Sequence, residues 1–348
     1  MLSNIELCSE MLEECVASMT NETVAKDKNS YKIIKAFSDF SKNYSVVIAI
    51  LALGLIFSIS TSYFFTGENI RNILIQSATV AIVASGQAMV IVSGEFDLSI
   101  GQNACITSCL AAYMMKFLGV SPWMAILTVL ILGTLIGVSN GLMVAYLRIP
   151  AFIATLGVQN IARGMAKVIT NAAPIARFPE SILFLGRGSI GILPYSVIIM
   201  VAVYLFFTLI FAKTRFGRYV YSVGGNKEAA YFSGINVRFA KMITFAIAGL
   251  MAAFGGIILM SRLDSAFITN GNLYEFDAII ASVIGGLSLA GGKGKIIGAL
   301  FGSIFLIMFF NGMTMLNVDP FYQDVLKGVV LIVAITIDVL RNTKRDQI

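Results

Sequence analysis

The chain has 348 residues, of which 57% are hydrophobic and only 13% are charged, whereas soluble domains carry about 25% charged residues. A soluble fold would expose too much of this apolar surface, so the composition indicates a membrane protein. Histidine is absent, which excludes Ser-His-Asp and Cys-His catalytic groups and the usual histidine-containing zinc and haem sites. The net charge is +6, and its distribution along the chain predicts the orientation.

Ten runs are apolar enough to cross a hydrocarbon core of about 30 Å, which takes about 20 helical residues. In chain order they lie near 45–65, 72–93, 99–118, 121–146, 151–170, 194–213, 239–261, 277–291, 295–317 and 323–340. The second, third and eighth are interrupted by glycine or polar residues, or are short enough to be half-helices. We therefore predict an all-α polytopic membrane protein with about ten transmembrane helices.

Lysine and arginine predict the orientation, because they collect in cytoplasmic loops. With the N-terminus inside, all but eight of the 25 fall in predicted cytoplasmic segments. The eight on predicted outer loops or their flanks are Arg71, Lys116, Arg163, Lys167, Arg177, Arg187, Arg262 and Lys327. Both termini are thus predicted to be cytoplasmic in a multi-pass protein of the cell membrane.

The same reading divides the chain into three parts. These are a cytoplasmic N-terminal segment at 1–43, a transmembrane domain at 44–341 that includes a long cytoplasmic loop at 214–238, and a cytoplasmic tail at 342–348. The first segment alternates glutamates with leucines and other apolar residues, which fits either a short amphipathic helix or a solvated tail. Its acidic start does not match a cleavable signal.

Two runs contain glycines at helical spacing, which lets helix backbones approach closely. The triplets are Gly133, Gly137 and Gly141, and Gly294, Gly298 and Gly302. Each triplet fits either close packing within one chain or an interface between two copies.

Polar side chains inside the apolar runs are candidates for a solute pathway, because each is costly in hydrocarbon unless it faces protein or water. The predicted pathway residues are Gln87, Asp97, Asn103, Asn140, Gln159, Asn160 and Asn311. Amides suit a neutral hydroxylated solute better than an ion, although any single amide can also be interhelical hydrogen-bond glue. The acidic residues fall at the ends of runs, which disfavours a proton-coupled or sodium-coupled carrier.

A glycine break at 93–101 separates the second run from the third. Gly94 can adopt a positive φ, and Asp97 is a good N-cap for the next helix. A weak echo of this segment occurs at 285–292, between runs on the same predicted side. The break fits either a tight cytoplasmic turn or a junction of half-helices near a pathway.

The loop at 214–238 contains its own helix signal. Asn226 is a good N-cap, Glu228 lies in the first turn, and Gly234 is placed as a C-terminal stop. A helix of about two turns with exposed Tyr231 and Phe232 is not stable alone in water. It needs a surface to pack on, which is either a partner protein or anionic lipid.

The order Glu228-Ala229-Ala230 followed by Gly234 resembles the EAA-x3-G signature of binding-protein-dependent ABC importer permeases. In those proteins the short helix inserts into a cleft on the ATPase subunit. The longer signature continues to I-x-L-P, and here Thr244 replaces the isoleucine and no proline follows. With 93–101 (SGEFDLSIG), 150–157 (PAFIATLG) and 285–294 (GGLSLAGGKG), the sequence resembles the ribose-type sugar importer permeases over about 45–340.

This resemblance implies an ABC importer permease fold and a set of partners. They are an ABC ATPase subunit, an extracytoplasmic sugar-binding protein, a second permease subunit that is identical or different, and membrane lipid, with no nucleic acid. The solute implied is a sugar, a monosaccharide such as a pentose. The residues implied as the ATPase-coupling helix are Asn226, Lys227, Glu228, Ala229, Ala230 and Gly234.

The chain contains no Walker A sequence, because the closest text, 286–294, has the wrong spacing and a glycine where Ser or Thr is needed. We therefore expect a transport subunit and not an enzyme, with no catalytic residues, metal or cofactor and with ATP hydrolysis on a separate subunit. The alternatives are a permease for a nucleoside or other small polar solute, and an ion-coupled secondary transporter. A membrane enzyme has the least support, because the chain lacks an acid–base constellation.

Overall fold

A computed structural model of the chain describes residues 46–346. The chain divides into two units, Met1–Ala49 and Ile50–Ile348, and the account below concerns the second. The predicted cytoplasmic segment at 1–43 lies outside the described residues, so its amphipathic helix stays a prediction.

Each of the ten apolar runs coincides with a helix in the described part of the chain. These helices are Val46–Ser60, α2 (Gly67–Val92), α3 (Ile100–Phe117), α4 (Pro122–Ala145), α5 (Ala151–Thr170), α7 (Tyr195–Lys213), α10 (Val237–Leu263), α11 (Tyr274–Ile284), α12 (Ile296–Met315) and α13 (Pro320–Asp346). Within that part, α2, α4, α7, α10 and α12 are long and apolar enough to cross a membrane. A mostly helical, polytopic chain is confirmed, whereas ten crossings stay a prediction.

Three further helices occupy the predicted loops. They are α6 (Glu180–Arg187), α8 (Arg215–Gly225) and α9 (Lys227–Phe232). Four two-residue strands also form, and the all-α prediction did not include them. β1 (Ile175–Ala176) pairs antiparallel with β4 (Ser265–Ala266), and β2 (Ser189–Ile190) pairs with β3 (Leu193–Pro194) in a hairpin.

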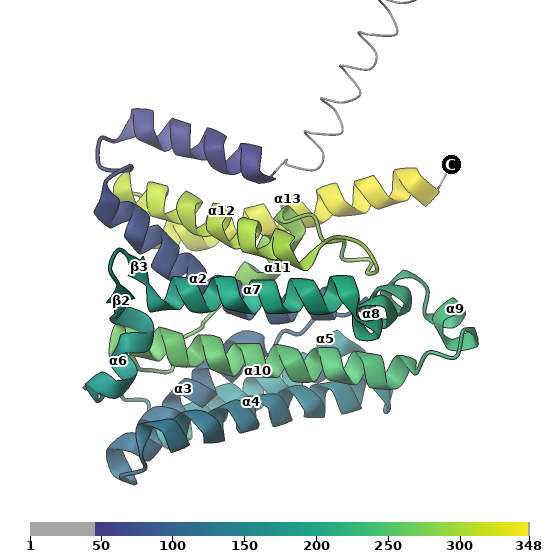
Figure 1. Ribbon diagram of the computed structural model, residues 1–348, viewed down its shortest axis with the longest axis horizontal. Coiled ribbons are helices and arrows are strands. Elements are labelled where there is room, and N and C mark those ends of the chain that lie inside the picture. Colours follow the sequence, from purple (N-terminus) through teal and green to yellow (C-terminus); the bar gives the residue numbers. More distant parts are fainter. Residues whose placement is uncertain (1–45, 347–348) are drawn as a thin grey trace, which may run out of the picture. The chain divides into compact units, whose positions relative to one another are not determined.

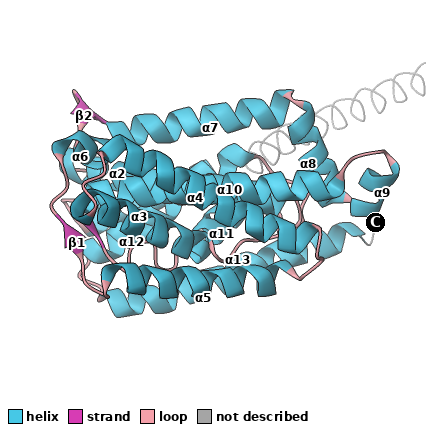
Figure 2. Cartoon of the chain, turned by 90° about the horizontal axis from the view of Figure 1, so that it is seen from below, coloured by secondary structure: helices cyan, strands magenta, loops and turns pink. Residues whose placement is uncertain are grey.

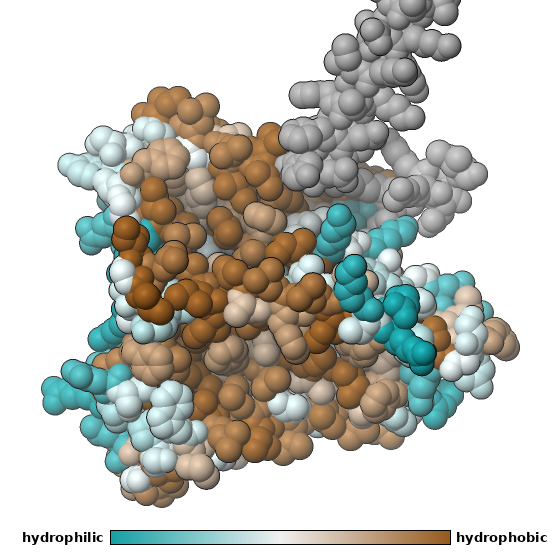
Figure 3. Space-filling view, viewed as in Figure 1, coloured by the Kyte–Doolittle hydropathy of each residue, from teal (hydrophilic) through white to brown (hydrophobic). Residues whose placement is uncertain are grey.

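The long helices lie side by side, with α10 packed against α4, α2 and α3 at the centre (Figure 1). Figure 2 shows α5 at one edge of the bundle, on the side away from α7. Apolar side chains cover the flank of the helices in Figure 3, and hydrophilic ones collect at the two ends. That distribution is the one expected where lipid surrounds the middle of a bundle.

The glycine triplets pack within the chain. A Cβ added to Gly137 would lie 2.2 Å from the carbonyl oxygen of Phe245, and one added to Gly141 would lie 2.7 Å from the Cα of Met242, both in α10. In the second triplet, a Cβ on Gly302 would lie 1.8 Å from the carbonyl oxygen of Ala281 in α11. The close-packing prediction is confirmed, and these glycines are not free to form an interface between copies.

The predicted half-helices resolve differently. α2 and α3 are continuous helices of 26 and 18 residues, so the half-helix alternative is wrong for them. α11 has 11 residues, or about 16 Å at 1.5 Å per residue, roughly half of a hydrocarbon core. It ends before the predicted run does, because Gly286 turns the chain with φ +88°.

Candidate functional site

Helix α9 is the short helix that the sequence predicts in the loop at 214–238. The side chain of Asn226 accepts a hydrogen bond from the N–H of Ala229 at 2.9 Å, and Gly234 follows the helix with φ +78°. Both residues have their predicted roles as cap and stop. The helix has six residues, slightly under two turns.

Helix α9 projects from one end of the bundle (Figure 1). Its one buried side chain is Ala230, which packs with Val223 and Val237 in a small apolar cluster. Tyr231 and Phe232 are 68% and 84% exposed. A short helix that exposes two neighbouring aromatic side chains has the surface expected of a docking element.

Helix α8 connects α7 to α9, and the sequence analysis did not predict it. Its buried residues Gly217, Val220 and Val223 recur every three positions, which was the available signal of an amphipathic helix. The hydroxyl of Tyr221 donates to the carbonyl of Gly294 at 2.7 Å. Burial raises the pKa of Tyr221, which keeps the hydroxyl protonated as the donor.

Four glycines from three distant segments meet next to α8, and we name them the glycine junction: Gly94, Gly224, Gly291 and Gly292. A Cβ on Gly224 would lie 1.8 Å from the carbonyl oxygen of Val92 and 2.6 Å from the nitrogen of Gly292. The N–H of Gly292 donates to the carbonyl of Val92 at 2.9 Å. The segments 93–101 and 285–292 are thus in direct backbone contact with the coupling loop.

The break between α2 and α3 holds a buried polar cluster around Asp97, which is 1% exposed. Its Oδ1 accepts from the N–H of Ser99 at 2.8 Å and from its hydroxyl at 2.6 Å. Asn140 of α4 donates to both carboxylate oxygens at 3.3 Å and to the hydroxyl of Ser99 at 2.8 Å. The amide of Gln87 lies 3.2–3.3 Å from the main chain of Asp97, with its nitrogen towards the C=O.

Two further contacts fasten this break to neighbouring helices. The N–H of Leu98 donates to the hydroxyl of Thr155 in α5 at 3.1 Å. The carboxylate of Glu95 forms an ion pair with the ammonium of Lys241 in α10. The break is therefore tied to α4, α5 and α10 as well as to the glycine junction.

The predicted N-cap of α3 is wrong. The helix begins at Ile100 and Ser99 occupies the cap position. Asp97 lies two residues earlier, where its carboxylate closes a turn by accepting the N–H of Ser99, as short acidic side chains commonly do. The same local preference of Asp for a backbone N–H gives a turn here because the chain reaches helical geometry later.

Two of the other predicted pathway residues serve as links between helices. Asn103 of α3 donates to the carbonyls of Gly133 in α4 at 3.1 Å and Gly249 in α10 at 3.4 Å. Asn311 of α12 and Asn69 of α2 exchange a pair of amide hydrogen bonds at 2.9 and 3.0 Å. Their observed contacts are those of interhelical hydrogen bonds.

The last two predicted pathway residues lie on α5. Gln159 donates to the carboxylate of Glu275 at 2.9 Å. Asn160 is exposed, and its amide donates to the carbonyl of Leu156 one turn back at 2.9 Å. The seven predicted residues therefore do not form one site: Gln87, Asp97 and Asn140 come together, and the other four lie elsewhere.

The first turn of α11 carries buried acids that the sequence analysis did not select. Glu275 and Asp277 are 2% and 4% exposed, and Asp277 pairs with Lys327 of α13 at 3.2 Å. The expectation that acids lie at the ends of runs is correct along the sequence but not in space. The end of an 11-residue helix lies inside the bundle, because that helix is shorter than its neighbours.

Comparisons with known proteins give the same assignment as this geometry. A family model described as "Branched-chain amino acid transport system / permease component" matches residues 69–335. The chain is 41% identical to the ribose import permease protein RbsC of Escherichia coli strain K12 over 296 residues, covering 84% of this chain and 92% of the relative. No solved structure matches the chain.

Two further relatives extend the similarity. The ribose import permease protein RbsC of Bacillus subtilis is 39% identical over 293 residues, covering 84% of this chain and 91% of the relative. The galactose/methyl galactoside import permease protein MglC of E. coli strain K12 is 33% identical over 329 residues, covering 89% and 98%. The chain therefore belongs to the ribose-type permeases of ABC importers and is a multi-pass membrane transport subunit, not an enzyme.

Proposed function

We propose that this chain forms half of the membrane pathway of an ATP-driven importer for a monosaccharide such as a pentose. The relatives' names, ribose import and galactose/methyl galactoside import, support a sugar as the solute. An extracytoplasmic binding protein delivers the sugar, and a separate ABC ATPase supplies the energy. Family membership favours this function over an ion-coupled secondary transporter.

The observation that carries the proposal is the connection of α9 to the interior. The exposed aromatics of α9 dock into the ATPase, in keeping with the predicted coupling role. Movement of α9 reaches α8, and the glycine junction passes it to the break that carries the Asp97 cluster. Because the junction is packed backbone against backbone, little displacement can be absorbed between these segments.

The proposed topology has ten crossings and both termini in the cytoplasm, as the distribution of Lys and Arg indicates. α9 and the glycine junction then lie on the cytoplasmic side. The β2–β3 hairpin and α6 lie on the outer side, where the binding protein delivers solute.

We propose that a second permease subunit packs against the outward face of α5. Gly157, Asn160, Gly164 and Lys167 recur at intervals of three or four along this face, and all are exposed. A Cβ on either glycine would meet nothing within 4 Å. Polar and small side chains are poorly suited to face lipid and well suited to a helix pair or an aqueous pathway.

Charge reversal at Glu228 tests the coupling role. Glu228 is exposed in the first turn of α9, so E228K should leave the fold intact and lower solute uptake about tenfold or more, as expected for a reversed charge at a docked interface. Uptake and ATP hydrolysis are measured together in vesicles that contain the permease, the ATPase and the binding protein.

The matched control is E180K, because Glu180 is also an exposed acid in the first turn of a short helix but lies at the other end of the bundle. It should leave coupling between ATP hydrolysis and uptake unchanged. Normal uptake and normal ATPase stimulation in E228K would contradict the coupling assignment.

The solute is tested on the binding protein that works with this permease. Calorimetric titration with ribose, galactose and a nucleoside should show tight binding of a monosaccharide, and uptake of that sugar should require this chain. Preference for the nucleoside would replace the solute assignment and leave the coupling role untouched.

A further inference from the structure

An arginine-lined pocket lies at the end of the bundle away from α9 (Figure 1). Its volume is about 410 Å³, and its lining includes Arg71, Arg187 and Arg262 together with the amides of Asn72 and Gln76. The three arginines come from α2, α6 and α10, so folding alone brings them together. All three lie on the predicted outer side of the membrane.

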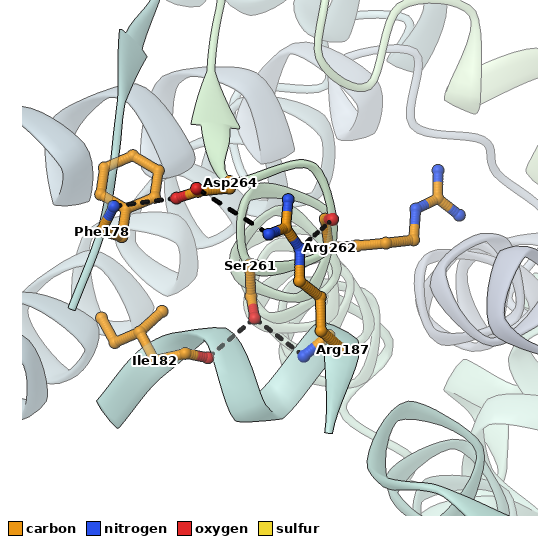
Figure 4. Close-up of polar contacts among 7 residues, drawn as sticks. Phe178, Ile182, Arg187, Ser261, Arg262 and Asp264 are labelled. Atoms are coloured by element: carbon orange, nitrogen blue, oxygen red, sulfur yellow. Dashed lines mark hydrogen bonds and ion pairs between the residues drawn. The ribbon is translucent and has the colours of Figure 1, made fainter. Parts of the chain in front are cut away.

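The charges in this pocket are incompletely paired. Arg187 lies 3.8 Å from the carboxylate of Asp264, and its Nε donates to the carbonyl of Arg262 at 2.9 Å (Figure 4). Figure 4 also shows the side chain of Arg262 extending away from Asp264. Within residues 46–346, neither Arg71 nor Arg262 forms an ion pair. Guanidinium groups stay charged at any relevant pH, so this cluster attracts an anion.

The frame of the pocket is held by hydrogen bonds. The hydroxyl of Ser261, which is fully buried, accepts from the N–H of Gly186 at 2.8 Å and donates to the carbonyl of Ile182 at 2.7 Å (Figure 4). This pair of bonds fixes the end of α6 on the end of α10. Arg187 and Arg262 are thereby placed before any ligand arrives.

An exposed apolar surface adjoins the pocket along the chain. Directly after Arg187, the β2–β3 hairpin exposes Ile190, Ile192 and Leu193 by 61%, 91% and 55%. The turn of the hairpin has Gly191 at φ +59°. A hairpin that presents three aliphatic side chains outward is stable in contact with hydrocarbon and poorly suited to water.

We propose that this pocket binds the phosphate headgroup of an anionic phospholipid, whose acyl chains lie beside the β2–β3 hairpin. Guanidinium forks match phosphate oxygens in a bidentate geometry, and the amides of Asn72 and Gln76 can donate to the remaining oxygens. The aliphatic hairpin favours a lipid over free phosphate or the acidic surface of a soluble protein. The proposal does not depend on the solute or on α9.

The test uses the full chain, purified in neutral detergent, with dioleoylphosphatidylglycerol, dioleoylphosphatidylcholine or inorganic phosphate as the probe. Thermal unfolding midpoints are measured as each is titrated. Phosphatidylglycerol should raise the midpoint at concentrations where phosphatidylcholine and inorganic phosphate do not. The double variant R71Q/R262Q should weaken the apparent affinity about tenfold or more.

The matched control is K116Q, which removes a cation on the same predicted side outside the pocket and should keep the phosphatidylglycerol response. R71K/R262K keeps the charges without the forks, and it should retain part of that response if R71Q/R262Q fails to fold. Equal responses to both lipids, or an unchanged response in R71Q/R262Q, would overturn the proposal. So would binding of inorganic phosphate alone with the same affinity, or loss of binding-protein docking in R71Q/R262Q without loss of lipid binding.

Discussion

Helices α4 and α5 carry similar residues in very different surroundings. Both contain glycines at helical intervals and an asparagine within an apolar run. The glycines of α4 meet the backbone of α10, whereas Gly157 and Gly164 of α5 meet nothing within 4 Å. Asn140 of α4 is fully buried among polar partners, and Asn160 of α5 is exposed. The same residue types therefore close a core in one helix and leave an open face in the other.

The largest expected effect comes from filling the closest approach between α4 and α10. In G137L the new side chain would overlap the carbonyl of Phe245, which should lower stability by about 3 kcal/mol. Thermal unfolding of the purified chain measures the loss. G157L on α5 is the control and should unfold at nearly the midpoint of the unmodified chain. Equal losses in the two variants would remove the distinction between the helices.

A smaller difference is expected between the two asparagines. N140A leaves the buried carboxylate of Asp97 without the two donor contacts at 3.3 Å, so it should lower stability by about 1–3 kcal/mol. N160A should change stability by less than about 0.5 kcal/mol, because its amide bonds only to its own helix. Unfolding midpoints measured in one detergent compare the two. A loss in N160A as large as that in N140A would mean that α5 is covered within the single chain.

The smallest effect on the stability of the chain is expected on the outer face of α5. G164A should stabilise the isolated chain by about 0.5–1 kcal/mol, because alanine favours a helix over glycine. G164W should leave the chain folded and reduce pairing with the second permease subunit, as measured by size-exclusion mass and by cross-linking.

The control for G164W is G328W, because Gly328 is also exposed with nothing within 4 Å but lies on α13. Pairing should survive in G328W. Undiminished pairing in G164W would place the second subunit on another face of the bundle.

Helix positions were largely predictable because they follow from local composition. A run of about 20 apolar residues must satisfy its own backbone in lipid, so it forms a helix regardless of its neighbours. The caps of α9 were predictable for a similar reason, since Asn226 and Gly234 act on backbone groups three residues away or closer. α8 was missed because its glycines and charges hide a short apolar stripe.

The polar residues were only partly predictable. Their burial in a membrane bundle follows from the cost of placing them in lipid, and six of the seven selected residues are at least partly buried. Which of them share a cluster depends on contacts between segments far apart in the chain, such as Asp97 with Asn140. Glu275 escaped selection because its burial arises from the short length of α11.

Composition, the apolar runs and the EAA-like loop together determined the class of the protein: a helical, polytopic permease with a capped, projecting helix. These properties depend on the hydrophobic effect and on hydrogen bonds within a few residues. Only the tertiary structure decided which glycines are packed, which amides meet a carboxylate, and that three arginines line one pocket. Such contacts depend on how whole helices dock, and the docking is set by the fit of many small side chains at once.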